Sequence, residues 1–171
     1  MSNFETAYRE ATVSDIPQMA LVWDRATEHG RGRPVPDTLT EPNRVPRLET
    51  VFAQEGAWSN VGIVNDKVAA FVIGHTTTDE NGQPRHDGSD YLAYLMRDPE
   101  YIGGGLGSTL LHWAVERSQT AGSSQLELWT TVDNIHARRL YEKVGFVAVG
   151  QPVMRHKKLG VPSIHYIKNL V

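Results

Sequence analysis

Residues 101–111 read YIGGGLGSTLL, and glycine fills four of the five positions 103–107, immediately before an apolar run. Glycine weakens the interior of helices and strands, so this stretch predicts a turn that opens a helix. Apolar residues then recur at helical intervals, and the helix is expected to end at about Gly122. Its first backbone N–H groups lie at the positive end of the helix dipole and lack partners within the helix. The stretch therefore predicts a site for an anion such as phosphate.

A plain tight turn at the start of a helix would also account for the glycines, and two other phosphate-binding patterns compete for them. A nucleoside-triphosphate loop needs a lysine before its Ser or Thr, whereas Gly107 is followed directly by Ser108 and Thr109. The dinucleotide-binding pattern needs a glycine or alanine where the sequence has Ser108 or Leu110. Glu127 lies at about the right distance to bind a ribose, but at the start of its expected strand. A nucleotide-binding oxidoreductase is thus the second choice.

The N-terminal half alternates strands and helices. A short strand leads into a helix that Ser14 or Asp15 is expected to cap, and a proline-rich loop separates it from a second helix before Gly56. Two β-rich runs then flank Asn65-Asp66, which is a favourable turn pair. A polar loop returns the chain to YLAYLMR at 91–97, so we expect three antiparallel strands.

The C-terminal part continues the alternation. QLELWTTV at 125–132 alternates as a strand does, and DNIHARRLYEKVGF at 133–146 predicts a helix with Asn134 at the N-cap and Gly145 just past the end. The tail predicts two more strands around a loop rich in glycine and proline. The element order therefore predicts a mixed α/β domain.

The composition indicates one soluble domain, residues 1–171, of which 40% are hydrophobic and 22% charged. The net charge of -3 and scattered basic residues argue against nucleic acid as a partner. Cysteine is absent, and neither a leader nor a run of about 18 apolar residues is found, so we expect a cytoplasmic protein without membrane contact. The seven histidines lack metal-ligand spacing, so no metal is expected.

Two ordered motifs give the sequence a family resemblance. LMRDPEYIGGGLGSTLL at 95–111, followed by LELWTTVDNIHARRLYEKVGFVAVG at 126–150, resembles the GNAT superfamily of N-acetyltransferases. The resemblance implies a mixed, mostly antiparallel central sheet of about six to seven strands, flanked by about four helices. It also implies an acetyl-CoA-binding core at about 91–147. Acetyl-CoA is then the expected cosubstrate.

The resemblance assigns a binding role to the glycine turn. In the family, Arg or Gln is followed after two residues by Gly and then, one residue later, by Gly or Ala. Gly105 and Gly107 match the small positions, whereas Ile102 stands where Arg or Gln is usual. Binding should therefore depend mainly on main-chain donors. The cofactor-binding residues expected in the turn are Gly103, Gly104, Gly105, Leu106, Gly107 and Ser108.

Further site residues follow from the family pattern on the later helix, in which Asn134, Arg138 and Tyr141 share a face. These three are expected to bind the cofactor, together with the main chain of Leu95, Met96 and Arg97, where the family's fourth strand separates from its neighbour. Tyr141 also suits a general acid, because a tyrosine with a pKa of about 10 holds its proton at neutral pH.

The proton acceptor has no motif behind it. Glu127 is named first, with Asp90 and His75 as alternatives. The expected acceptor substrate is a primary amine of a small molecule such as an amino acid, polyamine or antibiotic, in a pocket formed by residues 31–46, 76–90 and 150–165. A protein or peptide amine, or a non-catalytic acyl-CoA-binding domain, is the alternative. A homodimer through a strand edge or the tail is compatible with the sequence.

Overall fold

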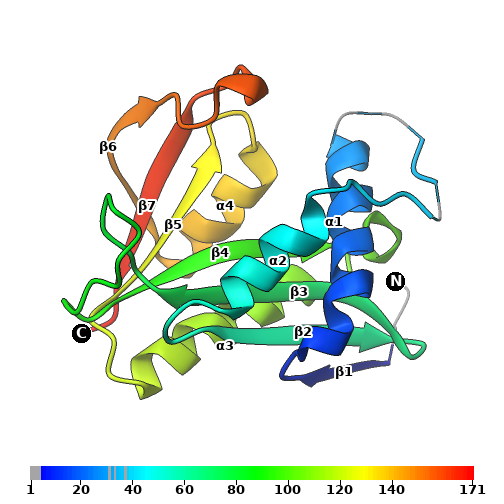
Figure 1. Cartoon of the computed structure of the whole chain (residues 1–171), viewed down its shortest axis with the longest axis horizontal. Helices are drawn as coiled ribbons and strands as arrows, with labels where there is room; N and C mark the ends of the chain where they lie inside the picture. Colours follow the sequence, from blue (N-terminus) through cyan, green and yellow to red (C-terminus); the bar gives the residue numbers. More distant parts are fainter. Residues whose placement is uncertain (1–4, 31, 33, 37) are drawn as a thin grey trace. The chain divides into compact units, whose positions relative to one another are not determined.

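The computed structural model describes residues 5–30, 32, 34–36 and 38–171. Within this part of the chain, seven strands and four α-helices follow one another in the predicted order (Figure 1). The elements are β1 (Thr6–Arg9), α1 (Ile16–Gly30), α2 (Arg44–Phe52), β2 (Trp58–Val64), β3 (Lys67–Thr76), β4 (Ser89–Arg97), α3 (Leu106–Thr120), β5 (Gln125–Thr131), α4 (Ile135–Val144), β6 (Val147–Val153) and β7 (Ser163–Asn169). Short 3-10 helices lie at Val13–Asp15, Pro99–Tyr101 and Lys157–Leu159.

The strands form one seven-stranded sheet in the order β1-β2-β3-β4-β5-β7-β6. The pairs β1/β2, β2/β3, β5/β7 and β6/β7 are antiparallel, and β4/β5 is parallel. The predicted mostly antiparallel α/β fold is therefore confirmed. In the β4/β5 ladder the paired residues run from Ser89↔Gln125 to Tyr91↔Glu127.

The chain divides into two compact units. The first comprises Met1–His75 and Tyr94–Trp113, and the second comprises Thr76–Ala93 and Ala114–Val171. Both β4 and α3 contribute one half to each unit. The expectation of a single domain stays a prediction.

The first unit is built around strands that are buried on both faces. Residues of β3 from Val68 to His75 are buried without alternation, which is the pattern of a strand covered on each side. Asn65 and Asp66 join β2 to β3 with φ values of 50° and 62°, so the predicted two-residue turn is confirmed. Gly62 of β2 leaves room for the ring of Tyr8 in β1, since a Cβ there would lie only 3.2 Å from that ring.

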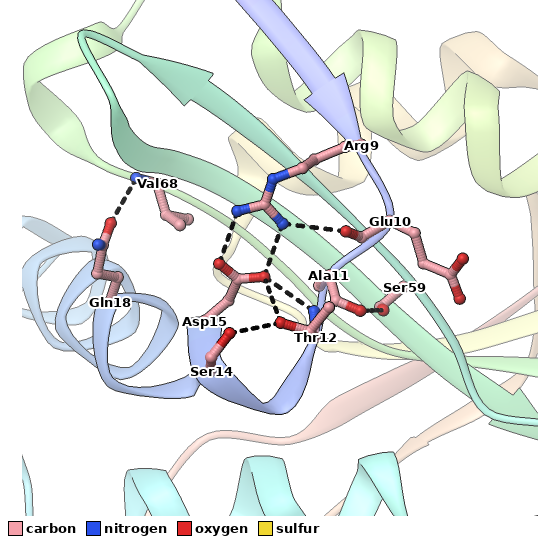
Figure 2. A network of polar contacts seen from close by, with 9 residues as sticks. All are labelled: Arg9, Glu10, Ala11, Thr12, Ser14, Asp15, Gln18, Ser59 and Val68. Atoms are coloured by element: carbon pink, nitrogen blue, oxygen red, sulfur yellow. Dashed lines mark hydrogen bonds and ion pairs between the residues drawn. The ribbon is translucent and has the colours of Figure 1, made fainter.

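The start of α1 differs from the prediction, as Figure 2 shows. Neither Ser14 nor Asp15 caps α1 directly, because Val13–Asp15 forms a 3-10 turn whose N-cap is Thr12. The Asp15 carboxylate accepts a hydrogen bond from the Thr12 N–H at 2.8 Å. It also receives both Arg9 amino groups at 2.8 Å, which lowers the pKa of Asp15. Asp15 thus ties β1 to α1.

The core of the second unit lies between α4 and the strands β5 and β7. Leu126, Leu128 and Tyr166 are almost completely buried there. The helix α4 ends at Val144, and the left-handed φ of 103° at Gly145 confirms the glycine predicted just past its end. No helix in the described ranges is both long and apolar enough to cross a membrane.

Candidate active site

The glycine loop, defined here as residues 102–107, runs from the 3-10 turn after β4 into the first turn of α3, within the first unit. Its geometry requires glycine at two positions, since φ is 88° at Gly103 and 73° at Gly105. A Cβ at either position would meet nothing within 4 Å. The loop therefore presents bare backbone to open space, as a site for a closely approaching ligand must.

The start of α3 supplies free hydrogen-bond donors. The first bond of the helix joins the N–H of Thr109 to the carbonyl of Gly105 at 3.0 Å. Across the described residues, no hydrogen bond is found for the N–H groups of Gly105, Leu106, Gly107 and Ser108. These donors lie at the positive end of a helix of 15 residues. The arrangement suits an anion, as the sequence predicts.

Buried contacts hold the chain just before the loop. The Asp98 carboxylate accepts a hydrogen bond from the N–H of Glu100 at 2.9 Å and lies 2.8 Å from Arg25 Nε of α1. The Asp98 N–H donates to the carbonyl of Ala69 in β3 at 2.8 Å. Side chains of Arg25 and Asp98 are only 16% and 11% exposed, so this pairing is shielded from solvent. These contacts fix the position of the chain at the point where the glycine loop begins.

The residues expected to lie where β4 separates from its neighbour are Leu95, Met96 and Arg97. All three are half-buried and lie beyond Tyr91, the last β4 residue in the parallel ladder with β5. Burial lowers the pKa of Arg97. Their main-chain donor role stays a prediction.

Tyr141 lies in α4 of the second unit and is 7% exposed. Its ring packs against Phe146 and Tyr166, with centroids 5.9 and 6.1 Å away. Burial, with a smaller contribution from Tyr91, raises the pKa of the Tyr141 hydroxyl. No hydrogen bond to another described residue is found for this hydroxyl. Tyr141 is therefore protonated throughout the neutral range, as a general acid must be.

The other two α4 residues are already engaged within the unit. Asn134 is the N-cap as predicted, but its side chain donates to Thr130 Oγ1 at 3.3 Å and makes no capping bond. Arg138 donates to the Tyr166 hydroxyl at 3.0 Å and to the carbonyl of Val132 at 2.7 Å. Arg138 thus links α4 to β7 and to the residue that follows β5. Its role in cofactor binding stays a prediction.

The Glu127 carboxylate of β5 is buried, and its two cationic or imidazole neighbours lie beyond normal hydrogen-bond distance. Its side chain is 8% exposed, and its Oε2 atom lies 3.5 Å from His165 Nε2 and 3.7 Å from Arg85 Nη1. Both distances exceed those of normal charge-assisted hydrogen bonds. The carboxylate therefore keeps acceptor capacity for a ligand.

Glu127 and Tyr141 lie on opposite faces of β5. Leu128 pairs with Tyr166 in the β5/β7 ladder, so these two side chains share a face, and Tyr141 packs on Tyr166. Glu127 precedes Leu128 and consequently points to the other face. The Glu127 side chain therefore leaves β5 in the direction opposite to the face on which Tyr141 packs.

The two alternative proton acceptors, Asp90 and His75, both have interaction partners within the protein. The Oδ2 atom of Asp90 accepts hydrogen bonds from Arg117 at 2.9 Å, Ser118 at 2.8 Å and Ser123 at 2.9 Å. This oxygen is saturated, which suits an anchor between β4 and the end of α3. His75 is buried in β3 of the first unit and also has an interaction partner. Glu127 remains the first choice.

Sequence reasoning missed the residues that surround Glu127 and Tyr141. Tyr166 bridges α4 by donating to Glu142 Oε1 at 2.7 Å. His165 stacks on Trp129 with centroids 4.6 Å apart and an interplanar angle of 9°, and Arg155 lies over the same tryptophan. The alternation of apolar and polar residues in SIHYIKN was the one available signal, and it does not reveal which strand lies alongside.

Comparison with known proteins identifies a matching family model. The model, described as Acetyltransferase (GNAT) family, matches residues 22–146, which include the glycine loop and α4. An uncharacterized N-acetyltransferase of Methanocaldococcus jannaschii is 30% identical over 83 residues, covering 48% of this chain and 36% of that protein. The matched stretch is thus little more than a third of the relative's length.

Solved structures share the fold along nearly the whole chain. The ribosomal-protein-S18-alanine N-acetyltransferase of Escherichia coli has a TM-score of 0.74 at 19% identity, covering 96% of this chain and 94% of that one. An N-acetyltransferase of Staphylococcus aureus Mu50 reaches 0.75 at 16% identity, covering 98% and 99%. The protein yncA of Salmonella typhimurium, solved with its cofactor acetyl-CoA, reaches 0.73 at 18% identity, covering 97% and 94%.

Proposed function

Because the chain belongs to the GNAT family of acetyltransferases, we propose that it transfers an acetyl group from acetyl-CoA to a primary amine. The observation that carries the proposal is the glycine loop, whose unpaired N–H groups and open glycines suit the pyrophosphate of coenzyme A. The similar fold of yncA, solved with acetyl-CoA, supports the choice of cosubstrate. The amine attacks directly, so the absence of cysteine is no obstacle.

The residues present fit this cosubstrate. Main-chain N–H groups from Gly105 to Ser108 would hold the pyrophosphate, whereas the N–H of Gly104 already donates to the carbonyl of Tyr101 at 3.4 Å. Gly103 and Gly105 would contribute by their lack of a side chain, which would otherwise fill the space that the ligand needs. Asn134 and Arg138 would contribute from α4, and Ile102 would leave the binding to the main chain. When bound, acetyl-CoA supplies the acetyl group as a thioester.

Three groups of the chain would serve the transfer. Main-chain N–H groups at Leu95–Arg97 would donate to the carbonyl oxygen on which negative charge develops. Glu127 would take a proton from the acceptor amine, directly or through water, since its carboxylate has only distant partners. Tyr141 would give the leaving sulfur its proton, because burial keeps the hydroxyl protonated.

The acceptor is proposed to be a small molecule bound by residues 31–46, 76–90 and 150–165. Residues 31, 33 and 37 of the first segment lie outside the described residues, and α2 already begins at Arg44. A protein amine is the second candidate, because the similarly folded Escherichia coli enzyme is named for ribosomal protein S18 alanine. A cytoplasmic location remains part of the proposal.

A thiol-release assay with acetyl-CoA and a panel of amines tests the function. Tyr141→Phe removes only the hydroxyl and keeps the ring packing, so we expect unchanged acetyl-CoA affinity and turnover lowered at least about tenfold. Tyr8→Phe is the matched control, because Tyr8 is 39% exposed on β1. Unchanged turnover in Tyr141→Phe would refute the acid role.

The alternatives give different results in the same assay. A non-catalytic acyl-CoA-binding domain is favoured if acetyl-CoA raises the melting temperature while no amine releases thiol. A nucleotide-binding oxidoreductase is favoured if NAD(H) stabilises the protein and coenzyme A does not.

A further inference from the structure

A stack of three side chains lies on the Glu127 face of β5 in the second unit. Trp129 is two residues from Glu127 and therefore points to the same face. His165 is opposite Trp129 in the β5/β7 ladder, and their rings are parallel. The guanidinium carbon of Arg155 lies 4.5 Å from the Trp129 ring centroid. The stack holds a flexible arginine in one place by cation–π attraction.

The stacked arginine has no counter-charge within the described chain. Arg155 is exposed, and no ion pair or side-chain hydrogen bond is found for it among the described residues. The same holds for Lys157 and Lys158, which follow it in the segment joining β6 to β7. This segment is consequently a positive surface that attracts anions. A guanidinium offers paired donors that match a carboxylate.

The negative group of the same face is Glu127. Arg85, the nearest cation, is also bonded to Asp87, and it lies 3.7 Å from Glu127. Burial, reinforced by Arg155 and Arg85, lowers the pKa of His165 despite the nearby Glu127 carboxylate. The His165 ring is therefore neutral at neutral pH and does not neutralise Glu127. The buried Nε2 atom of His165 has no hydrogen-bond partner among the described residues.

Arg155, in the segment between β6 and β7, thus holds an exposed guanidinium over Trp129. Trp129 is two residues from the Glu127 carboxylate, or roughly 7 Å along β5. We propose that the acceptor is a small amine that also carries a carboxylate, as amino acids do, with its amine at Glu127 and its carboxylate at Arg155. This proposal rests on the proposed acetyl transfer. A polyamine fits poorly, because its second ammonium would meet Arg155 and the two lysines.

The chemistry balances with these groups. The ammonium of the acceptor first loses one proton to Glu127, which releases it to solvent. The amine nitrogen then forms a bond to the acetyl carbon, the carbon–sulfur bond breaks, and the nitrogen loses a second proton, which through water replaces the one that Tyr141 gives up. The sulfur leaves as a thiolate and takes its proton from Tyr141. The carboxylate of the acceptor takes no part in bond making, so Arg155 acts on binding and specificity.

The test compares each acceptor with its own amide. L-alanine, L-aspartate and L-phenylalanine are assayed beside their α-carboxamides, with spermidine as a cationic probe, by thiol release from acetyl-CoA. We expect at least one acid to exceed its amide at least about tenfold in kcat/KM, since a charge-assisted contact is lost in the amide. Arg155→Gln should reduce this ratio to about one through a higher KM. Arg139→Gln, an exposed cation on α4, is the matched control and should keep the ratio.

Calorimetric titration of the same acids into the full chain separates this proposal from the acetyl transfer. Acid binding that Arg155→Gln weakens about tenfold, without thiol release, would uphold the anion site and contradict the transfer. Thiol release with spermidine or the amides at the rate of the acids would overturn the acceptor class. So would an acid preference that survives Arg155→Gln, or a preference for peptides over free amino acids. Neither binding nor turnover of any acid would also overturn it.

Discussion

Replacing Gly105 by valine tests the glycine loop directly. The residue has a φ of 73°, and a Cβ built on it points into open space. The substitution therefore has two separable effects. It strains the left-handed backbone, and it places a branched side chain where we expect the pyrophosphate to approach.

The strain can be matched elsewhere in the chain. Gly82 has a φ of 75° and also has nothing within 4 Å of its Cβ position, but it lies in the loop between β3 and β4. A left-handed conformation costs a non-glycine residue about 1–2 kcal/mol. For a chain of this length, that corresponds to a melting temperature lower by roughly 2–8 °C. Gly82→Val and Gly105→Val should therefore destabilise the free protein similarly.

The two variants should differ only in ligand binding. Calorimetric titration with acetyl-CoA should show native affinity for Gly82→Val and a loss of at least about a hundredfold for Gly105→Val, because a blocked approach removes several main-chain contacts at once. If Gly105→Val binds acetyl-CoA as tightly as the native chain does, the glycine loop is not the pyrophosphate site. Equal losses in both variants would mean that strain alone explains the effect.

Two further predictions concern titratable side chains of the second unit. Asp90→Ala leaves Arg117, Ser118 and Ser123 without their shared acceptor, so we expect thermal unfolding to show a free energy of unfolding lower by about 3–5 kcal/mol. The control Asp133→Ala removes an exposed carboxylate and should change this free energy little. A small loss in both variants would contradict the anchor role of Asp90. The pKa of His165 is lower in the folded than in the unfolded protein, so the unfolded chain binds more protons between the two pKa values. The contribution of His165 to the free energy of unfolding should therefore be fully present above about pH 6.5 and be lost as the pH falls below that value. Denaturant unfolding of His165→Gln should show a weaker acid dependence than the native chain, and an identical dependence would refute the assignment.

Local signals account for the parts of the fold that the sequence predicted well. Asn65-Asp66 forms a turn because both residues tolerate positive φ, and Gly145 ends α4 for the same reason. The start of α1 was predicted less well. Thr12 and the 3-10 turn replace the expected Ser14 or Asp15 cap, because Asp15 is drawn into a bidentate contact with Arg9 of β1. That contact depends on a neighbour whose position the local sequence does not specify.

The roles of charged residues depended more strongly on long-range packing. Asp90 and Glu127 are similar candidates in the sequence, yet one is saturated by three donors and the other has only distant partners. The stack of Arg155, Trp129 and His165 joins residues from two strands and a loop. No local pattern brings these three together.

The amino-acid sequence by itself determined the order of strands and helices and the glycine loop before α3, because periodicity, glycine content and turn chemistry act over a few residues. It also placed Tyr141 on a helix face. Only the tertiary structure decided that Tyr141 is buried against Tyr166, and that Glu127 points to the opposite face of β5, where Arg155 lies over Trp129. Those relations arise from strand pairing between β5 and β7, whose partners lie far apart in the sequence. The charge and hydrogen bonding of a side chain are set by such neighbours.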